Sequence, residues 1–479
     1  MERILKIKLS SYLVISSVSF SYLILPQRAG ISVPIFVVIQ FLCLFFIVPK
    51  RTPLLMFVPI FMLSLNSFIS GSDIWLVSNF FVTLALYSLM VMMISGEYEF
   101  DAPALKFILD MTRNIYTPFC HFSVPIKWGL ESSRDQGKLM KRILAGIVFS
   151  IPCLVFLITI LSSADAVFSK HISSFFINAQ SFLSANLLFR WLCGLVAGFY
   201  LFGLIYLSCQ PREETSIDFH FKSGGDLLIM HIVLFSILLV YTVFTIIQFK
   251  YLFAESGELP YGLSYTYYAR RGFFELLFLS GVNIGAILLV VELTQEELGF
   301  GVQLTRGLCC YLCLMTFILL FSSFYRMWLY NSDSGLTRLR FLVLGFLIFE
   351  AIGLVFTFIY IVKPQFNIIA IYLLIGLVYY LLLNIIPMDS FIAGNQIDRY
   401  LATGKGDIHY ALSLSSDAAP QISKLLMSDD PRLIVSAQGF FSAQRKDYER
   451  FQGWRKYNLS AEKCKHFFDH NAEIVFPDR

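Results

Sequence analysis

Residues 338–363 read RLRFLVLGFLIFEAIGLVFTFIYIVK, an apolar run that contains one carboxylic acid, Glu350. Such a run is long enough to cross the roughly 30 Å hydrocarbon core of a bilayer as a single α-helix. Comparable runs recur along the 479-residue chain, in which 57% of residues are hydrophobic and 15% are charged, whereas soluble domains have roughly 25% charged residues. The sequence therefore predicts an all-α, polytopic transmembrane helix bundle of about 10–12 spans.

Eleven stretches of the chain are candidate spans. They lie near residues 9–25, 30–49, 53–70, 74–95, 143–163, 183–208, 227–249, 272–292, 307–325, 339–363 and 366–386. The first follows three basic residues, as the apolar part of a signal peptide would, but no small-residue cleavage site precedes Pro26. We therefore expect it to be retained as the first helix.

The chain changes character after Pro387, where a charged segment follows the apolar spans. Residues 387–479 carry 12 Lys/Arg and 12 Asp/Glu, which predicts a soluble helical C-terminal domain without a net basic face for nucleic acid. Ser416 or Asp417 can cap one helix with Pro420 in its first turn, and residues 440–456 predict another.

The expected organisation has four parts. N-terminal transmembrane helices occupy residues 1–100, a basic cytoplasmic loop with an interfacial helix occupies 101–142, a core transmembrane bundle occupies 143–386, and the C-terminal domain occupies 387–479.

Lys and Arg residues predict the orientation, because basic loops stay in the cytoplasm. Three precede the first span, seven lie between Lys106 and Arg142, and others lie before the eighth span, before the tenth span and in the C-terminal domain. These clusters disagree in an eleven-span chain, because three spans separate the 101–142 loop from the loop before the eighth span. An even number of spans would resolve the conflict, so we expect both termini in the cytoplasm.

Four stretches resemble a known bacterial family. They are SSADAVF (162–168), YTYYARRGFFELL (265–277), SGLTRLR (334–340) and DAAPQISKLL (417–426). Together they resemble domain-of-unknown-function family 4173, uncharacterised multipass membrane proteins related to family 4153. The resemblance covers roughly residues 140–430 and implies a multipass protein of the bacterial cell (inner) membrane. It implies no activity, substrate or catalytic residue.

Excluding the ends of the predicted spans, four ionisable residues lie inside them, namely Arg190, His231, Glu275 and Glu350. A charged side chain at mid-membrane costs on the order of 2.5–3.5 kcal/mol, and less near the interface. The first three lie within about two turns of a span end. Glu350 lies about eleven residues, or about 16 Å of helical rise, from either end of its span.

Gly353, Thr357 and Tyr360 share the helix face of Glu350, so this narrow polar stripe should face other helices or a cavity. Two interpretations of the acid remain open. It is a proton or ion site, or it is a structural group paired with Arg190 or His231.

Two arginines precede the eighth span. Arg271 can pair with Glu275 four residues later on one helix face, and Arg270 and Arg271 should lie at headgroup level. They serve as an interfacial anchor for membrane lipids, or they bind an anionic headgroup or substrate.

Motifs for chemistry are not found in the sequence. It has no HExxH, no nucleophile elbow and no complete P-loop, so no catalytic residue, cofactor or metal is predicted. Cys309, Cys310 and Cys313 have no second ligand pair nearby and are interpreted as packing residues. CKHFFDH (464–470) is interpreted as solvated surface.

Two GxxxG patterns, Gly194/Gly198 and Gly281/Gly285, predict close helix packing within the chain, with dimerisation as the alternative.

Three functions fit these observations. Small-solute or proton-coupled transport, supported by the buried acid, is the best interpretation. The second is a membrane sensor or scaffold that signals to a cytoplasmic protein through the C-terminal domain. The third, an integral-membrane enzyme for lipid-linked substrates, lacks a catalytic motif.

Overall fold

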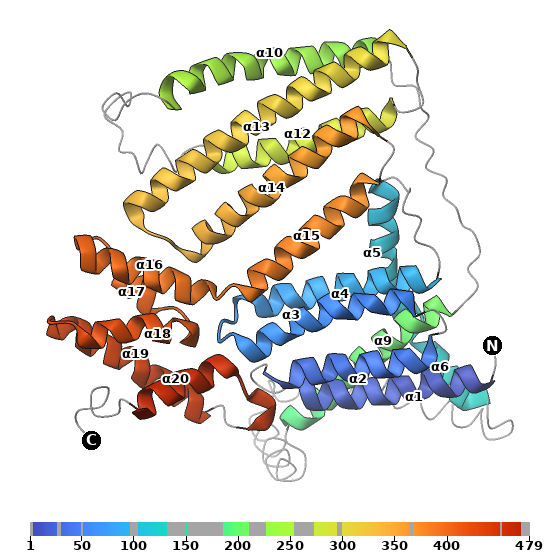
Figure 1. Ribbon diagram of the computed structural model, residues 1–479. Helices are drawn as coiled ribbons and strands as arrows, with labels where there is room; N and C mark the ends of the chain where they lie inside the picture. Colours follow the sequence, from blue (N-terminus) through green and yellow to red (C-terminus); the bar gives the residue numbers. More distant parts are fainter. Residues whose placement is uncertain are drawn as a thin grey trace, which may run out of the picture.

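The computed structural model describes most of the chain as helices (Figure 1). The described residues are 3–25, 30–48, 51–95, 104–131, 150, 185–209, 227–252, 273–294, 299–364, 367–450 and 453–470. Apart from residue 150, the predicted span at 143–163 lies outside them, as do the stretch SSADAVF and both Arg270 and Arg271. Among the described residues, nine helical segments are long and apolar enough to cross a membrane, and no strand occurs. The predicted all-α membrane helix bundle is confirmed.

The first group of helices forms an N-terminal bundle. It comprises α1 (Arg3–Ser19) with the π-helical extension η1 (Phe20–Ile24), α2 (Ser32–Ile47), η2 (Thr52–Met56) leading into α3 (Phe57–Ile69), α4 (Ile74–Ser95), α5 (Ala104–Cys120), α6 (Ser123–Glu131) and α9 (Ala185–Ser208). Apolar side chains from these helices, including Leu9, Leu44, Ile60, Met90 and Phe202, form one buried core. The apolar runs therefore bury one stripe in this core and leave the remainder for lipid.

Helices α1 and α9 cross closely through small residues. A Cβ atom added to Gly194 would collide with Ser21, and one added to Gly198 would collide with Ser17. This GxxxG pattern therefore packs within the chain, as predicted. Among the described residues the second pattern does not pack this closely, because a Cβ added to Gly281 lies 4.0 Å from Glu350 Oε1 and one added to Gly285 meets no atom within 4 Å.

The second group forms a separate bundle. It comprises α10 (Leu227–Leu252), α12 (Phe273–Leu293), α13 (Phe300–Ser334) and α14 (Arg338–Val362), with a core of its own. α15 (Ile368–Ile385) packs against α14 and against α3, so it lies between the two bundles (Figure 1). α13 is 35 residues long and is therefore longer than the predicted span of 307–325. The helix continues through the more polar residues on both sides of the apolar part.

The chain ends in a C-terminal module of short helices. They are α16 (Met388–Thr403), α17 (Ile408–Leu412), η4 (Ser416–Ala418), α18 (Ala419–Ile422), η5 (Ser423–Met427), α19 (Pro431–Arg450), η6 (Trp454–Lys456) and α20 (Leu459–His470). Their core also includes Trp75 at the start of α4, Leu336 between α13 and α14, and Leu383 near the end of α15. The module is therefore packed on one end of the bundles (Figure 1). The predicted cap is shifted, since Ser415 caps η4.

The C-terminal module lies at the opposite end of the molecule from the start of α1. At the module's end, Ile31 N–H at the start of α2 donates to Tyr457 O, and Arg455 Nη1 donates to Tyr22 O at the end of η1. At the far end, Lys8 Nζ donates to Phe46 O near the end of α2.

The basic segment that contains α6 also lies at the far end, because Lys6 stacks over the Trp128 ring. The start of α1 and α6 therefore lie at one end of the bundle and the C-terminal module at the other, whereas both termini and the 101–142 loop were expected on one side. Which side of a membrane each end faces stays a prediction.

Candidate functional site

Glu350 lies at the middle of α14, twelve residues from each end, or about 18 Å of helical rise. Its side chain is 4% exposed. Gly353, Thr357 and Tyr360 are buried on the same face, so the stripe faces other helices and not lipid.

The only hydrogen bond of Glu350 within the described residues joins it to α12. Ser280 Oγ lies 2.7 Å from Glu350 Oε1 and also 2.7 Å from Leu277 O. Both oxygens would be acceptors if Glu350 were charged, yet a hydroxyl has one proton to donate. A neutral Glu350 satisfies both contacts, because its O–H donates to Ser280 Oγ and the Ser280 hydroxyl donates to Leu277 O.

The second oxygen of the acid, Oε2, is buried and has no hydrogen-bond partner among the residues that the structure describes. The nearby side chains are neutral. Tyr372 on α15 and Thr357 share a hydrogen bond of 2.7 Å, and the Tyr372 ring is so close to Gly353 that a Cβ there would lie 2.8 Å from it. The acid thus lies among α12, α14 and α15, and no cation contacts it in the part of the chain that the structure describes.

A neutral hydrogen-bond chain lies one helical turn further along α12. Tyr241 donates to Asn283 Oδ1 at 2.8 Å, and Asn283 Nδ2 donates to Thr316 Oγ1 at 3.1 Å. These contacts link α10, α12 and α13 at the level next to Ser280. The apolar bundle therefore contains a buried polar layer with Glu350 at one edge.

Of the other predicted site residues, the three that the structure describes do not gather around Glu350. Arg190 lies on α9 in the N-terminal bundle, where its Nε is buried and has no hydrogen-bond partner within the described residues. His231 Nε2 lies 2.8 Å from Thr305 Oγ1 and 3.1 Å from Gly301 O, where α10 meets α13. Glu275 is exposed in the first turn of α12. The pairing of Glu350 with Arg190 or His231 is therefore not found.

In the described part of the chain, no three His, Cys, Asp or Glu side chains come together in a way that could hold a metal.

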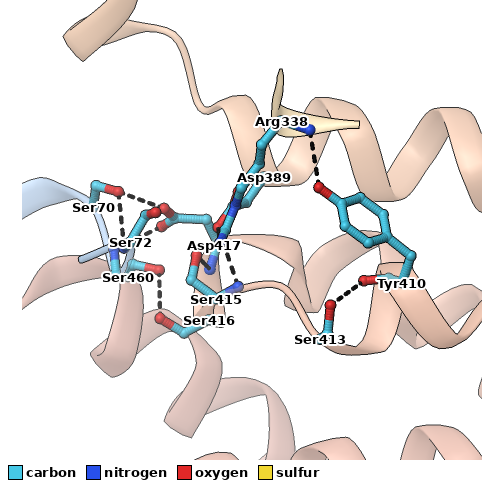
Figure 2. Close-up of polar contacts among 11 residues, drawn as sticks. Ser70, Ser72, Arg338, Asp389, Tyr410, Ser413, Ser415, Ser416, Asp417 and Ser460 are labelled. Carbon is cyan, nitrogen blue, oxygen red and sulfur yellow. Dashed lines mark hydrogen bonds and ion pairs between the residues drawn. The ribbon is translucent and has the colours of Figure 1, made fainter. Parts of the chain in front are cut away.

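A second polar cluster joins α14 to the C-terminal module (Figure 2). Arg338 Nε donates to Asp389 Oδ1 at 2.7 Å and Arg338 Nη2 to Oδ2 at 2.5 Å, while Ser415 N–H donates to Oδ2 at 3.1 Å. Burial by itself raises the pKa of Asp389, but the Arg338 and Ser415 hydrogen bonds and the Arg338 charge outweigh it and hold that pKa below its ordinary value.

The module also holds the turn between α3 and α4. Asp417 Oδ2 accepts from Ser70 Oγ at 2.5 Å and Oδ1 from Gly71 N–H at 3.0 Å (Figure 2). Asn458 Nδ2 donates to Ser67 O at 3.0 Å and to Ser70 O at 2.6 Å. The module thus binds the N-terminal bundle as well as α14.

Sequence reasoning did not identify Asp389, Asp417 or Asn458 as contact residues. One available signal was that SGLTRLR contains Arg338 and DAAPQISKLL contains Asp417, so two of the four distinctive stretches supply this cluster.

The family described as "Domain of unknown function (DUF4153)" matches residues 57–425. The chain belongs to this family. The match confirms the predicted relation to a domain family of unknown function, family 4153, while the finer assignment to family 4173 stays a prediction. No curated protein and no solved structure matches the chain.

The family match begins at α3 and ends in η5. It therefore includes Glu350, Arg338, Asp389 and Asp417, but neither α1 and α2 nor the last helices α19 and α20.

Proposed function

We propose that this membrane protein is a proton-linked transporter of a small solute, in which Glu350 binds and releases the proton. The observation that carries the proposal is the contact of Ser280 Oγ with both Glu350 Oε1 and Leu277 O: with a neutral acid both contacts can be hydrogen bonds at once, whereas beside a charged acid the Ser280 hydroxyl can donate to only one of the two oxygens. A structural acid would be charged and paired with a cation, and Glu350 has no such partner among the described residues.

Proton release from this position needs a change in its surroundings. The charged form costs on the order of 2.5–3.5 kcal/mol at mid-membrane, so it is favoured only when water or a cationic solute reaches the carboxylate. A conformation that admits water or a cationic solute therefore favours the charged form of Glu350, whereas the closed conformation favours the neutral form. This difference couples the protonation of Glu350 to the arrangement of α12, α14 and α15.

The proposed location is the bacterial inner membrane, which the resemblance to multipass bacterial proteins supports. We place the C-terminal module in the cytoplasm, because Arg338 and Arg340 lie at its end of the bundle together with the Lys and Arg residues of the module that the structure describes.

Proton flux into vesicles tests the function. The purified full-length chain is reconstituted into vesicles that contain a pH-sensitive dye, and a pH gradient is imposed under a potassium–valinomycin clamp. Wild-type protein should carry protons when its solute is supplied from a library of small metabolites. Glu350→Gln should reduce the flux to the level of protein-free vesicles.

Glu275→Gln is the matched control, because Glu275 is an exposed acid on a span of the same bundle. It should leave the flux unchanged. Equal fluxes for the wild type and Glu350→Gln would contradict the proposal.

A second candidate function is sensing, and the module's contacts favour it. The module is bonded to α14 through Asp389 and to the α3–α4 turn through Asp417. A relative movement of the two bundles would therefore strain or release it, and a cytoplasmic partner protein could detect this change. Capture of the same partner by wild type but not by a chain ending at Ile386 would support this candidate.

A further inference from the structure

The C-terminal module contains a cleft of about 510 Å³ between α19, η6 and α20. This volume falls within the range of about 300–1,000 Å³ that is usual for small-ligand sites. Six charged side chains line the cleft, namely Arg445, Lys456, Lys465, Glu449, Glu462 and Asp469. Their formal charges cancel, so the cleft suits a ligand with both a positive and a negative group.

One wall of the cleft rests on the membrane helices. Tyr457 and Asn458 line the cleft, and the same residues bond to the start of α2 and the end of α3. Arg455 donates to Tyr22 O at 2.9 Å, and its guanidinium lies 4.6 Å from the centre of the Tyr22 ring. The cleft therefore lies where the spans end, at the level of lipid headgroups.

Exposed aromatic residues mark the same level. Trp454 lines the cleft and is 54% exposed, and its ring centre lies 6.3 Å from that of Tyr22, which is 51% exposed. Tryptophan and tyrosine are enriched where proteins meet the membrane–water boundary, because their rings are apolar and carry a polar group. Both rings are thus placed to contact lipid next to the cleft.

The ion pairs inside the cleft can rearrange at small cost. Lys465 Nζ lies 3.6 Å from Glu462 Oε1, and Arg445 Nε lies 3.0 Å from Glu449 Oε1. Each pair is partly exposed, and such pairs contribute little to stability. A phosphate could therefore bind the cationic groups while an ammonium binds the carboxylates, each through charge-assisted hydrogen bonds.

We propose that this cleft binds the headgroup of an aminophospholipid, which carries one phosphate and one primary ammonium. Three carboxylates favour a primary ammonium over a quaternary one, because only the primary ammonium can donate hydrogen bonds to them. The site would hold the module on the membrane surface. It does not depend on the proposed transport.

Photo-crosslinking of lipids to the full-length protein in nanodiscs tests this inference. Three probes with the same photoreactive acyl chain are compared: phosphatidylethanolamine, phosphatidylcholine and phosphatidylglycerol. Peptides from residues 445–469 should be labelled most strongly by phosphatidylethanolamine. Phosphatidylcholine tests the need for hydrogen bonds from the amine, and phosphatidylglycerol tests the need for the amine itself.

Lys456→Glu should lower labelling by phosphatidylethanolamine about tenfold, because a phosphate contact becomes repulsive. Lys446→Glu is the matched control, since Lys446 is exposed on α19 and does not line the cleft. It should change labelling little. Asp469→Asn, a milder change at an exposed lining residue, should reduce the preference for phosphatidylethanolamine over phosphatidylcholine even if Lys456→Glu disturbs the module.

Equal labelling of these peptides by all three lipids would overturn the inference. Equal losses from Lys456→Glu and Lys446→Glu would overturn it as well, because the effect would then be one of net charge. Circular dichroism and thermal unfolding of each variant establish that the module is folded.

Discussion

Asp389 accepts two hydrogen bonds from the guanidinium of Arg338, and its carboxylate is fully buried while the Arg338 side chain is 30% exposed. The two residues lie 51 positions apart, one at the start of α14 and the other at the start of α16. This ion pair therefore fastens the C-terminal module to the second helix bundle.

Asp389→Asn should loosen the module. Removing one charge of a buried pair costs roughly 3–5 kcal/mol, and the partial exposure of Arg338 lowers the expected loss to about 2–3 kcal/mol. Hydrogen–deuterium exchange in residues 388–470 should rise accordingly. Asp398→Asn is the matched control on the same helix, because the Lys424–Asp398 pair is exposed and should be worth about 0–1 kcal/mol. Equal exchange in the two variants would contradict the role of Arg338.

Acid should also loosen the C-terminal module of the wild-type protein. The pKa of Asp389 is lower in the folded protein than its unfolded value of about 3.9, so folding favours the charged form. The stabilisation is fully present above the unfolded pKa and is lost as the pH falls through the folded pKa. Exchange should therefore rise below about pH 4 in the wild type.

Asp389→Asn provides the comparison for this pH dependence. The stability of the variant should not show the decrease at acid pH that is caused by protonation of the Asp389 carboxylate. If the difference between wild type and variant stays constant between neutral pH and about pH 3, Asp389 is not the titrating group.

The α1–α9 crossing should not tolerate a methyl group. Gly198→Ala forces a collision with Ser17, including its backbone nitrogen at 2.9 Å, and should cost about 1–3 kcal/mol. Gly285→Ala, in another span, meets no atom of the described residues within 4 Å and should be neutral or slightly stabilising. Thermal unfolding in detergent compares the two variants, and equal melting temperatures would argue against the close crossing.

The two ends of the bundle should lie on opposite sides of the membrane. Lys127 on α6 and Lys405 after α16 are exposed residues at the two ends. In a cysteine-free background, an impermeant maleimide added to intact cells should label Lys127→Cys but not Lys405→Cys. Labelling of both or of neither would contradict the arrangement. The reverse pattern would contradict only the cytoplasmic placement of the module.

Local patterns predicted the spans and the inward direction of the acid stripe, because length, hydropathy and helical spacing act over a few turns. Each of the ten predicted spans that fall on described residues overlaps a helix, and Glu350 is buried together with Thr357. The partner of the acid was not predicted, since Ser280 is 70 residues away and one of many serines.

The contacts of the C-terminal module were not predictable for the same reason. Asp417 was interpreted as a helix cap, which is the local role for an aspartate before Pro420, yet its carboxylate binds Ser70 and Gly71. The relation between the two ends of the chain was also missed, because basic residues occur at both ends of the bundle.

Infrared spectroscopy of the reconstituted protein tests most directly whether Glu350 is a neutral acid that exchanges its proton. At neutral pH, the wild type should have a carbonyl-stretch band of a protonated carboxylic acid that shifts on transfer to D₂O. Glu350→Gln should lack this band, and Glu275→Gln should retain it. A wild-type spectrum without the band, or a band that survives in Glu350→Gln, would contradict the account.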